Sequence, residues 1–217
     1  MNERIGRRKK REQTARRRVP ELGYYFIVTD TNETERNYML GLRESIPEEL
    51  QGKLVIKVSR AKTEELIDEA QKMASLHPQF GEIWIVFDRD EVGDFDKIIA
   101  KAQERNINVG WSNPCIEIWF SAYFGVMPAC LDSVSCCEDF KKQYNKTTKQ
   151  RYEKSDPSIY TKLCHYGNEE RAIEIAEKKH NYHIRNDRTK PAIMRPCTTM
   201  YMLIREIKGK IERNRKA

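Results

Sequence analysis

The chain of 217 residues has no apolar run long enough to cross a membrane, and no apolar segment near its start that would direct secretion. It also has no CxxC pair, although it holds six cysteines. Without an export signal, we expect reduced thiols, a cytoplasmic location and no membrane partner. A zinc site is disfavoured because no known ligand framework has the spacing of Cys130, Cys136, Cys137, Cys164 and His165.

An excess of positive charge is confined to the start of the chain. The formal net charge is +7, and residues 1–18 alone hold nine Lys or Arg against two acids. We expect this segment not to pack, and to bind phosphates through salt-sensitive counterion release. The alternative is a solubilising or expression-related tail. The nucleic-acid interpretation assigns phosphate contacts to Arg7, Arg8, Lys9, Lys10, Arg16, Arg17 and Arg18.

Strand-like and helix-like patterns alternate four times between residues 22 and 124. Apolar, β-branched runs predict strands at 22–29, 53–58, 83–87 and 107–111. Amphipathic patterns predict helices at 33–45, 63–77, 94–105 and 116–124. This alternation is typical of the α/β class, with a mostly parallel four-stranded sheet and helices on both faces. The loops after the strands then open on one edge of the sheet.

The remaining residues predict flanking segments around this core. Residues 1–20 form the basic tail, 21–125 the α/β core, and 126–217 a helical insert and C-terminal helices that pack on the core. The highly charged residues 138–154 are expected to be an exposed helical or irregular insert, in which several lysines could follow a nucleic-acid backbone. Further helices are predicted at 158–166, 169–180 and 198–211. No internal repeat is visible.

Two carboxylates follow the third predicted strand directly. In extended backbone, Asp88 and Asp90 point the same way, just past the carboxyl end of a buried strand. Open α/β sheets bind their ligands at this edge, and two carboxylates there suit Mg²⁺. The alternative is a solvated, Asp-rich turn.

Acids after the neighbouring strands strengthen the metal interpretation. Asp30 and Glu35 follow the first strand, and Glu117 follows the fourth, one helical turn after Asn113. Clustered carboxylates repel one another, and a divalent cation resolves that repulsion. Such a cation stabilises the attacking and leaving oxygens of phosphoryl transfer, while a carboxylate moves the proton. Asp30 as a turn residue and Asn113 as a helix N-cap are the structural alternatives.

Three segments carry a resemblance to a known family. They are DTNETERNY (residues 30–38), VFDRDE (86–91) and SNPCIEIWF (112–120). In their order they resemble the EGxxTExxY, FDxD and SNPxFExW motifs of the RloB-like family, which is similar to the Toprim domains of OLD-type nucleases and topoisomerases. A last motif, NPSTxxxxL, has a weak counterpart in RPCTT (195–199). The resemblance extends over residues 22–207.

The resemblance implies a Toprim-like, Mg²⁺- or Mn²⁺-dependent nuclease that cleaves RNA, including tRNA, or DNA in abortive defence against phage. By position, Asp30 replaces the catalytic Glu, and Asn113 matches a motif residue in contact with nucleic acid. A regulatory ATPase, another defence-system subunit or a second copy of the chain are the protein partners that the resemblance suggests. The implied catalytic acids are Asp30, Glu35, Asp88, Asp90 and Glu117, of which Asp30, Glu35, Asp88 and Asp90 hold the metal.

The first motif departs from the family pattern. Asp30-Thr31 stands where the family has Glu-Gly, so the acid is shorter, and Thr31 disfavours the backbone conformations that glycine allows. The main alternative is therefore a catalytically weakened subunit that binds nucleic acid or a partner. A third interpretation is phosphoryl transfer other than strand cleavage, of the primase or phosphatase kind.

Other residues have simpler explanations. His180 and His183 are expected on a solvated helix face, with a role in catalysis as the less favoured interpretation. The aromatic residues of the predicted strands and helices are expected in the core before they are expected to stack on bases. They are Tyr24, Tyr25, Trp84, Trp111 and Trp119.

Overall fold

The computed structural model describes residues 25–29, 33–58, 65–77, 81–90 and 92–215. Asp30, Thr31, Tyr24 and the basic tail lie outside these residues. The strands are β1 (Tyr25–Thr29), β2 (Leu54–Val58), β3 (Glu82–Asp88), β4 (Asn108–Asn113) and β5 (Cys197–Thr198). The helices are α1 (Thr34–Ser45), α2 (Glu48–Gln51), α3 (Leu66–Leu76), α4 (Phe95–Glu104), α5 (Glu117–Tyr123), α6 (Ser133–Thr148), α7 (Ile159–Tyr166), α8 (Glu169–Arg185) and α9 (Met200–Arg215), with a short 3-10 helix η2 (Pro191–Ile193).

The described strands form one sheet in the order β2-β1-β3-β4-β5. The first four are parallel, as predicted, whereas β5 pairs antiparallel with β4. The prediction of four strands is therefore wrong by one strand. β5 is only two residues long, so it leaves no hydrophobic period in the sequence, and its backbone is fixed by contacts with a distant strand. The Thr199 N–H, for example, donates to the Trp111 carbonyl at 2.8 Å.

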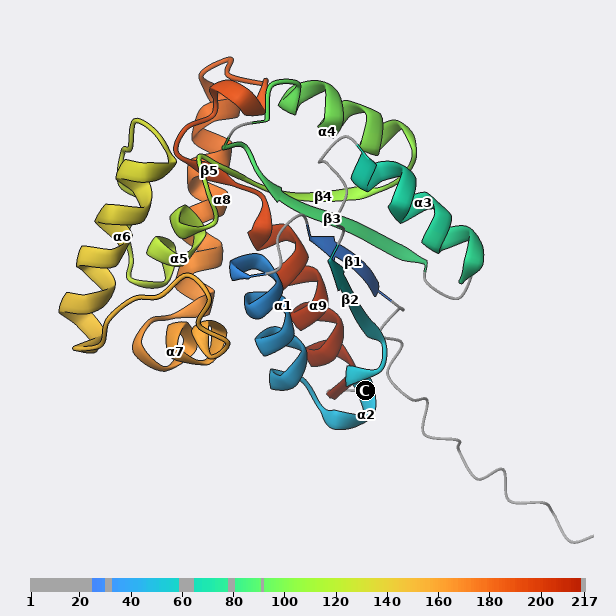
Figure 1. The fold of residues 1–217 in the computed structure, drawn as a ribbon, viewed down its shortest axis with the longest axis horizontal. Helices are drawn as coiled ribbons and strands as arrows, with labels where there is room; N and C mark the ends of the chain where they lie inside the picture. The colour runs from blue at the N-terminus through green and yellow to red at the C-terminus, as the bar shows by residue number, and fades with distance from the viewer. Residues whose placement is uncertain (1–24, 30–32, 59–64, 78–80, 91, 216–217) are drawn as a thin grey trace, which may run out of the picture.

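Helices cover both faces of the sheet, as predicted (Figure 1). Alternate residues of β1 face opposite sides, because the side-chain period of a strand is two. Phe26 and Val28 pack in the apolar cluster that includes α3 and α4. Tyr25 and Ile27 pack in the cluster that includes α1, α5 and α9. Each face of the sheet thus has its own core.

Residues 138–154 are better packed than the charge pattern predicted. Helix α6 buries Phe140 and Tyr144, which are four residues apart and lie on one face of the helix. The Phe140 ring lies 4.8 Å, centroid to centroid, from that of Tyr152. Lys141 and Lys142 remain exposed on the other face. The many charged residues of this segment therefore made its narrow aromatic stripe hard to recognise in the sequence. That stripe packs α6 against the core.

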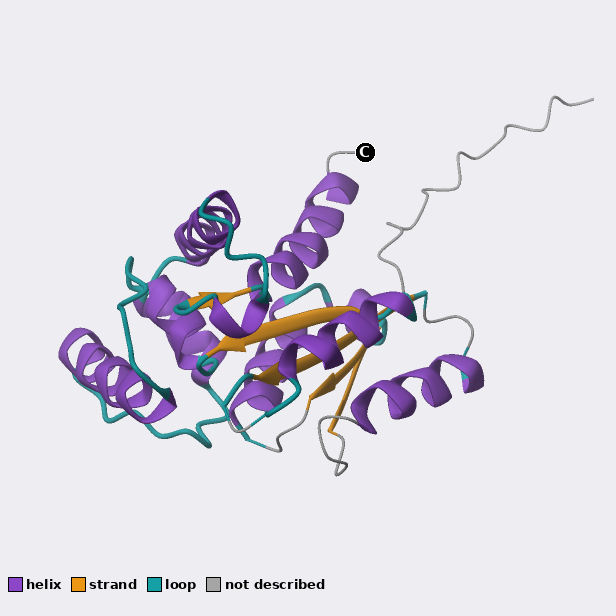
Figure 2. Cartoon of the chain, turned by 90° about the horizontal axis from the view of Figure 1, so that it is seen from above, coloured by secondary structure: helices purple, strands orange, loops and turns teal. Residues whose placement is uncertain are grey.

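The last helix ties the C-terminal region to the sheet. In Figure 1, α9 runs beside α1 on the same side of the sheet, and in Figure 2 it is the helix that leads to the marked C-terminus. It buries Leu203, Ile204 and Ile207. On its outer side, Arg205 makes two hydrogen bonds with the carboxylate of Glu177, at 2.6 and 2.7 Å. Among the described residues, no helix combines the length and the apolar character needed to span a bilayer.

Candidate functional site

Asp88 and Asp90 lie where the segments that follow β3 and β4 meet. The Ile116 backbone N–H donates to Asp88 Oδ2 at 2.8 Å, and the Asp90 N–H donates to the Pro114 carbonyl at 3.1 Å. Asp90 is exposed, and its Oδ1 accepts a hydrogen bond from Ser133 Oγ at 2.6 Å. The backbone bends directly after Asp88, so the assumption of extended backbone fails at Asp90. Each carboxylate is instead oriented by the start of a different helix.

Glu117 is a buried acid in the first turn of α5. It is 2% exposed, and its Oε1 accepts a hydrogen bond from the Tyr152 hydroxyl at 3.0 Å. Lys154 Nζ lies 4.0 Å from the same oxygen. Desolvation acts to lower the pKa of Lys154, but Glu117 and two neighbouring cysteines outweigh it and leave the pKa raised. A buried carboxylate needs such partners, and here residues 152–154 supply them.

The same segment fastens the start of α1, which holds Glu35. Thr34 Oγ1 donates to the Lys154 carbonyl, and Asn37 Nδ2 donates to the Ser155 carbonyl, both at 3.0 Å. Glu35 is 4% exposed in the first turn of this helix. Glu35 and Glu117 therefore belong to helix starts that are held by one short segment, residues 152–155.

Asp30 lies outside the described residues, but the strand that precedes it, β1, lies next to the strand that carries Asp88. β1 lies beside β3 in parallel register, with Thr29 opposite Val86. The carboxyl end of β1 therefore adjoins that of β3. Asp30 follows Thr29 directly in the sequence, so its predicted part in the site stays consistent with the strand order.

Asn113 does not cap α5, so that structural alternative is wrong. The helix begins at Glu117 without a side-chain cap, after a cis peptide between Asn113 and Pro114. Asn113 Nδ2 instead donates to the carbonyls of Pro191 and Ala192, at 2.9 and 3.2 Å. Its Oδ1 is buried and has no hydrogen-bond partner. The amide thus attaches η2 to the end of β4, and its predicted contact with nucleic acid stays a prediction.

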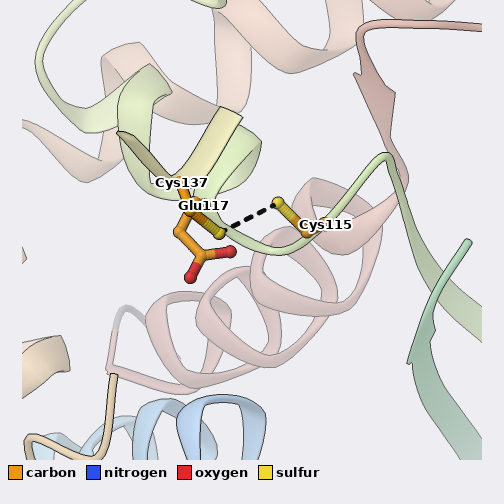
Figure 3. A group of neighbouring side chains, drawn as sticks. All are labelled: Cys115, Glu117 and Cys137. Atoms are coloured by element: carbon orange, nitrogen blue, oxygen red, sulfur yellow. Dashed lines mark hydrogen bonds between the residues drawn. The ribbon is translucent and has the colours of Figure 1, made fainter. Parts of the chain in front are cut away.

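Beside these acids lies a group that sequence reasoning missed. Cys115, Glu117 and Cys137 come together from the β4–α5 connection, α5 and α6, and their side chains point toward one another (Figure 3). The two Sγ atoms are 3.8 Å apart, and all three potential ligand atoms lie within 4.8 Å of one another. No such three-residue group among the described residues includes Asp88 or Asp90. Only the folding of α6 onto α5 unites these residues, so their spacing in the sequence gave no signal.

A pocket opens next to this group. It has a volume of about 480 Å³, and its lining combines Asp90 and Cys137 with the cations Lys141 and Lys154. A mixture of acids and lysines is suited to a metal ion together with a phosphate group. A larger cavity of about 760 Å³ lies along β4, next to α4 and α8, and none of the predicted site acids lines it.

The two candidate histidines do not lie on a solvated face. His183 is 1% exposed, and its Nε2 lies 3.1 Å from the Pro196 carbonyl oxygen. His180 Nδ1 lies 3.0 Å from the Tyr201 hydroxyl. Desolvation lowers the pKa of both imidazoles. The aromatic residues expected in the core are buried there, namely Tyr25, Trp84, Trp111 and Trp119.

Comparison with known proteins supports the motif reading. The family described as RloB-like protein has a model that matches residues 25–207, which includes the sheet, the acids after β3 and β4, and the first half of α9. No curated protein matches the chain. No solved structure matches it either. Because the match extends over well more than half of the chain, the protein belongs to the RloB-like family.

Proposed function

We propose that the carboxyl edge of the sheet is a Toprim-like, Mg²⁺- or Mn²⁺-dependent nuclease site that cleaves RNA, tRNA included, or DNA in defence against phage. The observation that carries the proposal is the junction of the β3 and β4 loops. There the N–H of Ile116 orients the carboxylate of Asp88, and Glu117 follows in the next residue. Acids from two motifs thereby share one edge, the usual ligand position in parallel sheets.

The acids of this edge fit a hard divalent cation. Mg²⁺ binds one or two carboxylates and keeps its other positions for water and phosphate oxygens, so Asp88 and Asp90 are sufficient as its main ligands. Asp30 and Glu35, from the adjoining end of β1 and the start of α1, would complete the ligand set. When bound, the cation would supply charge stabilisation for the phosphoryl oxygens.

The remaining polar groups orient the reactants. In hydrolysis, a water oxygen bonds to phosphorus, the ester bond breaks, and the departing oxygen gains a proton. Asp30 is our candidate for the acid or base that moves a proton, if it is not itself a ligand. Glu117, held by the Tyr152 hydroxyl, would orient the ligand shell. Lys154, beside Glu117 and on the pocket wall, would offset the charge of the incoming phosphate.

The first test is cleavage by the purified chain. Total tRNA, single-stranded RNA and plasmid DNA are incubated with Mg²⁺, Mn²⁺ or EDTA, and the double variant Asp88→Ala/Asp90→Ala is assayed in parallel. Asp139→Asn is a matched control, because Asp139 is a half-buried acid of α6 that pairs with Lys142. Metal-dependent cleavage that the control keeps and the double variant loses supports the proposal. Cleavage that survives in the double variant refutes this assignment of the site.

The departure in the first motif favours a second function, that of a binding subunit with weakened catalysis. If the folded chain binds nucleic acid but cuts none of these substrates, Asp30→Glu with Thr31→Gly is the next variant. Cleavage gained by that variant would mean that the first motif limits catalysis. Binding without cleavage in both proteins would support the binding subunit, and a defined nucleotide product would support a different phosphoryl transfer.

A further inference from the structure

We propose that Cys115, Cys137 and Glu117 form a site for Zn²⁺, or a similar thiophilic divalent cation, next to the hard-metal edge at Asp88 and Asp90, with Glu117 between the two. The inference rests on the geometry of these three side chains and does not depend on the nuclease proposal. It assigns the two cysteines a role that neither the motifs nor the family match describes.

The separation of the two sulfur atoms suits a zinc thiolate pair. Zn–S bonds are about 2.3 Å long and structural zinc is tetrahedral, so two bound sulfurs lie about 3.8 Å apart. Cys115 Sγ and Cys137 Sγ are separated by 3.8 Å. The third ligand atom, a Glu117 carboxylate oxygen, lies within 4.8 Å of both. A tetrahedral site needs about 3.5 Å between sulfur and oxygen. Rotation about a side-chain bond of Glu117 can bring its carboxylate oxygen that much closer to the sulfurs.

The surroundings resemble those of a metal site more than those of an ordinary core. Cys115 is 4% exposed and Glu117 is 2% exposed, so both are shielded from bulk water. The Tyr152 hydroxyl donates to the Glu117 carboxylate, as the outer partners of metal ligands commonly do. Lys154 would balance the charge left over when two thiolates and a carboxylate bind a dication. Three protein ligands also leave a fourth position for water, the usual arrangement of catalytic zinc.

The local concentration of thiols adds to the argument. Cys115 and Cys136 are buried in one small apolar cluster, against which Cys130 and Cys137 pack. Four of the six cysteines of the chain therefore lie at the junction of α5 and α6. Buried cysteines are often inert small apolar residues. A carboxylate placed among them is not explained by apolar packing, and a shared cation would be a further partner for it beside Tyr152 and Lys154.

The position suggests what the cation would do. Cys137 lines the same pocket as Asp90, so the zinc site and the candidate nuclease edge share one cavity. Cys137 belongs to α6, while Cys115 and Glu117 belong to the chain around the start of α5. Zinc would therefore join α6 to α5 beside the residue, Ile116, that orients Asp88. The site would thus stiffen the wall of the pocket.

The test measures metal content and coordination. Untagged protein is reduced, loaded with Zn²⁺, freed of excess metal and analysed by elemental mass spectrometry. We expect about one zinc per chain, and at least about 100-fold weaker binding in Cys115→Ser and in Cys137→Ser, because loss of an outer partner alone costs about 10- to 100-fold. Cys164→Ser is the control, since Cys164 is an exposed cysteine of α7.

A spectroscopic measurement on wild-type protein tests the site even if the serine variants fail to fold. Wild-type protein loaded with Co²⁺ should show a thiolate-to-cobalt charge-transfer band and the visible bands of tetrahedral cobalt. Zinc retention by both serine variants, or loaded wild-type protein without zinc and without a cobalt–thiolate band, would overturn the proposal. The readout is binding, so it stands or falls separately from any nuclease assay.

Discussion

The Ile116 N–H donates to Asp88 Oδ2 at 2.8 Å, so the chain just before α5 orients the carboxylate at the end of β3. One hydrogen bond thereby links the FDxD segment to the SNPCIEIWF segment. Both segments begin at the carboxyl ends of neighbouring parallel strands, where Asp88 is opposite Ser112. Asp88 therefore has two separable properties, its negative charge and its acceptance of a hydrogen bond from Ile116. A substitution that removes only the charge can test the two separately.

Under the proposed nuclease function, Asp88→Asn should strongly lower the cleavage rate with little loss of stability. Asparagine keeps an oxygen that accepts from Ile116 but removes the charge that a dication needs. A bound metal contributes several kcal/mol to the transition state, so we expect at least about a 100-fold loss in cleavage rate. Free energies of unfolding from urea titrations should change by less than about 1 kcal/mol. Equal rates for Asp88→Asn and wild type would exclude Asp88 as a metal ligand.

Tyr152→Phe should destabilise the chain through Glu117. The substitution removes the hydroxyl that donates to a carboxylate that is 2% exposed. Leaving a buried acceptor without its donor costs about 1–3 kcal/mol, measured here as the free energy of unfolding in urea with EDTA present. Tyr182→Phe, at a residue that is 56% exposed, is the control and should change stability little. A similar change in both variants would show that the hydrogen bond contributes nothing of its own.

Sequence patterns predicted the sheet well because its strands are buried runs of ordinary length. The run that ends at Asp88, for example, occupies the inside of the sheet and so contains almost only apolar residues. Patterns failed where long-range contacts decide the structure. Strand β5 exists because Thr198 meets Ser112, and the thiol pair exists because α6 folds over Cys115.

The placement of the candidate acids was predictable to the same extent. The acids after β3 and β4 could be placed at one edge from the strand rhythm alone, because parallel strands end on the same side. The bend after Asp88 could not be foreseen, since the Asp90 N–H bonds to Pro114, a residue from another loop. His183 likewise looked polar in the sequence but is buried against the Pro196 carbonyl.

Two glycine substitutions should have opposite effects on stability. A Cβ added to Gly41 in α1 would lie 2.6 Å from Tyr160 Cβ, so Gly41→Ala should lower the free energy of unfolding by about 1–3 kcal/mol. Around Gly209, inside α9, a Cβ would meet nothing within 4 Å. Gly209→Ala should therefore raise that free energy by about 0.5–1 kcal/mol, because alanine favours a helix. Urea titration of each variant checks both signs.

Burial of His180 and His183 should make the fold sensitive to acid. Desolvation lowers both pKa values in the folded chain, whereas the unfolded chain keeps values near about 6.5. Below that pH the unfolded state binds more protons. The stability that the two neutral histidines contribute is therefore fully present above about pH 6.5. It is lost as the pH falls toward their lowered pKa values in the folded chain.

The loss is bounded and can be measured. Between about pH 7.5 and pH 5.5 it is at most about 1.4 kcal/mol for each histidine. The double variant His180→Gln/His183→Gln should lose correspondingly less stability on acidification, whatever its stability at neutral pH. His165→Gln, at an exposed residue of α7, should keep the wild-type pH dependence. Parallel pH profiles for wild type and the double variant would contradict the argument.

Removal of residues 1–18 should weaken nucleic-acid binding and reduce its dependence on salt. This segment holds the whole formal charge of +7, so under the proposed function it would be the main source of sequence-independent attraction to phosphates. Each duplex phosphate that it neutralises adds about 0.9 to the slope of log affinity against log salt, so contacts from half of its nine basic residues account for a slope of about 4. Fluorescence anisotropy over a range of salt concentrations measures that slope.

A scrambled tail of the same composition should restore the slope, because counterion release depends on charge and not on the order of the residues. An unchanged slope in the truncated chain would mean that the nucleic acid is held by the folded core, and the lysines of the Asp90 pocket would then be the next residues to substitute.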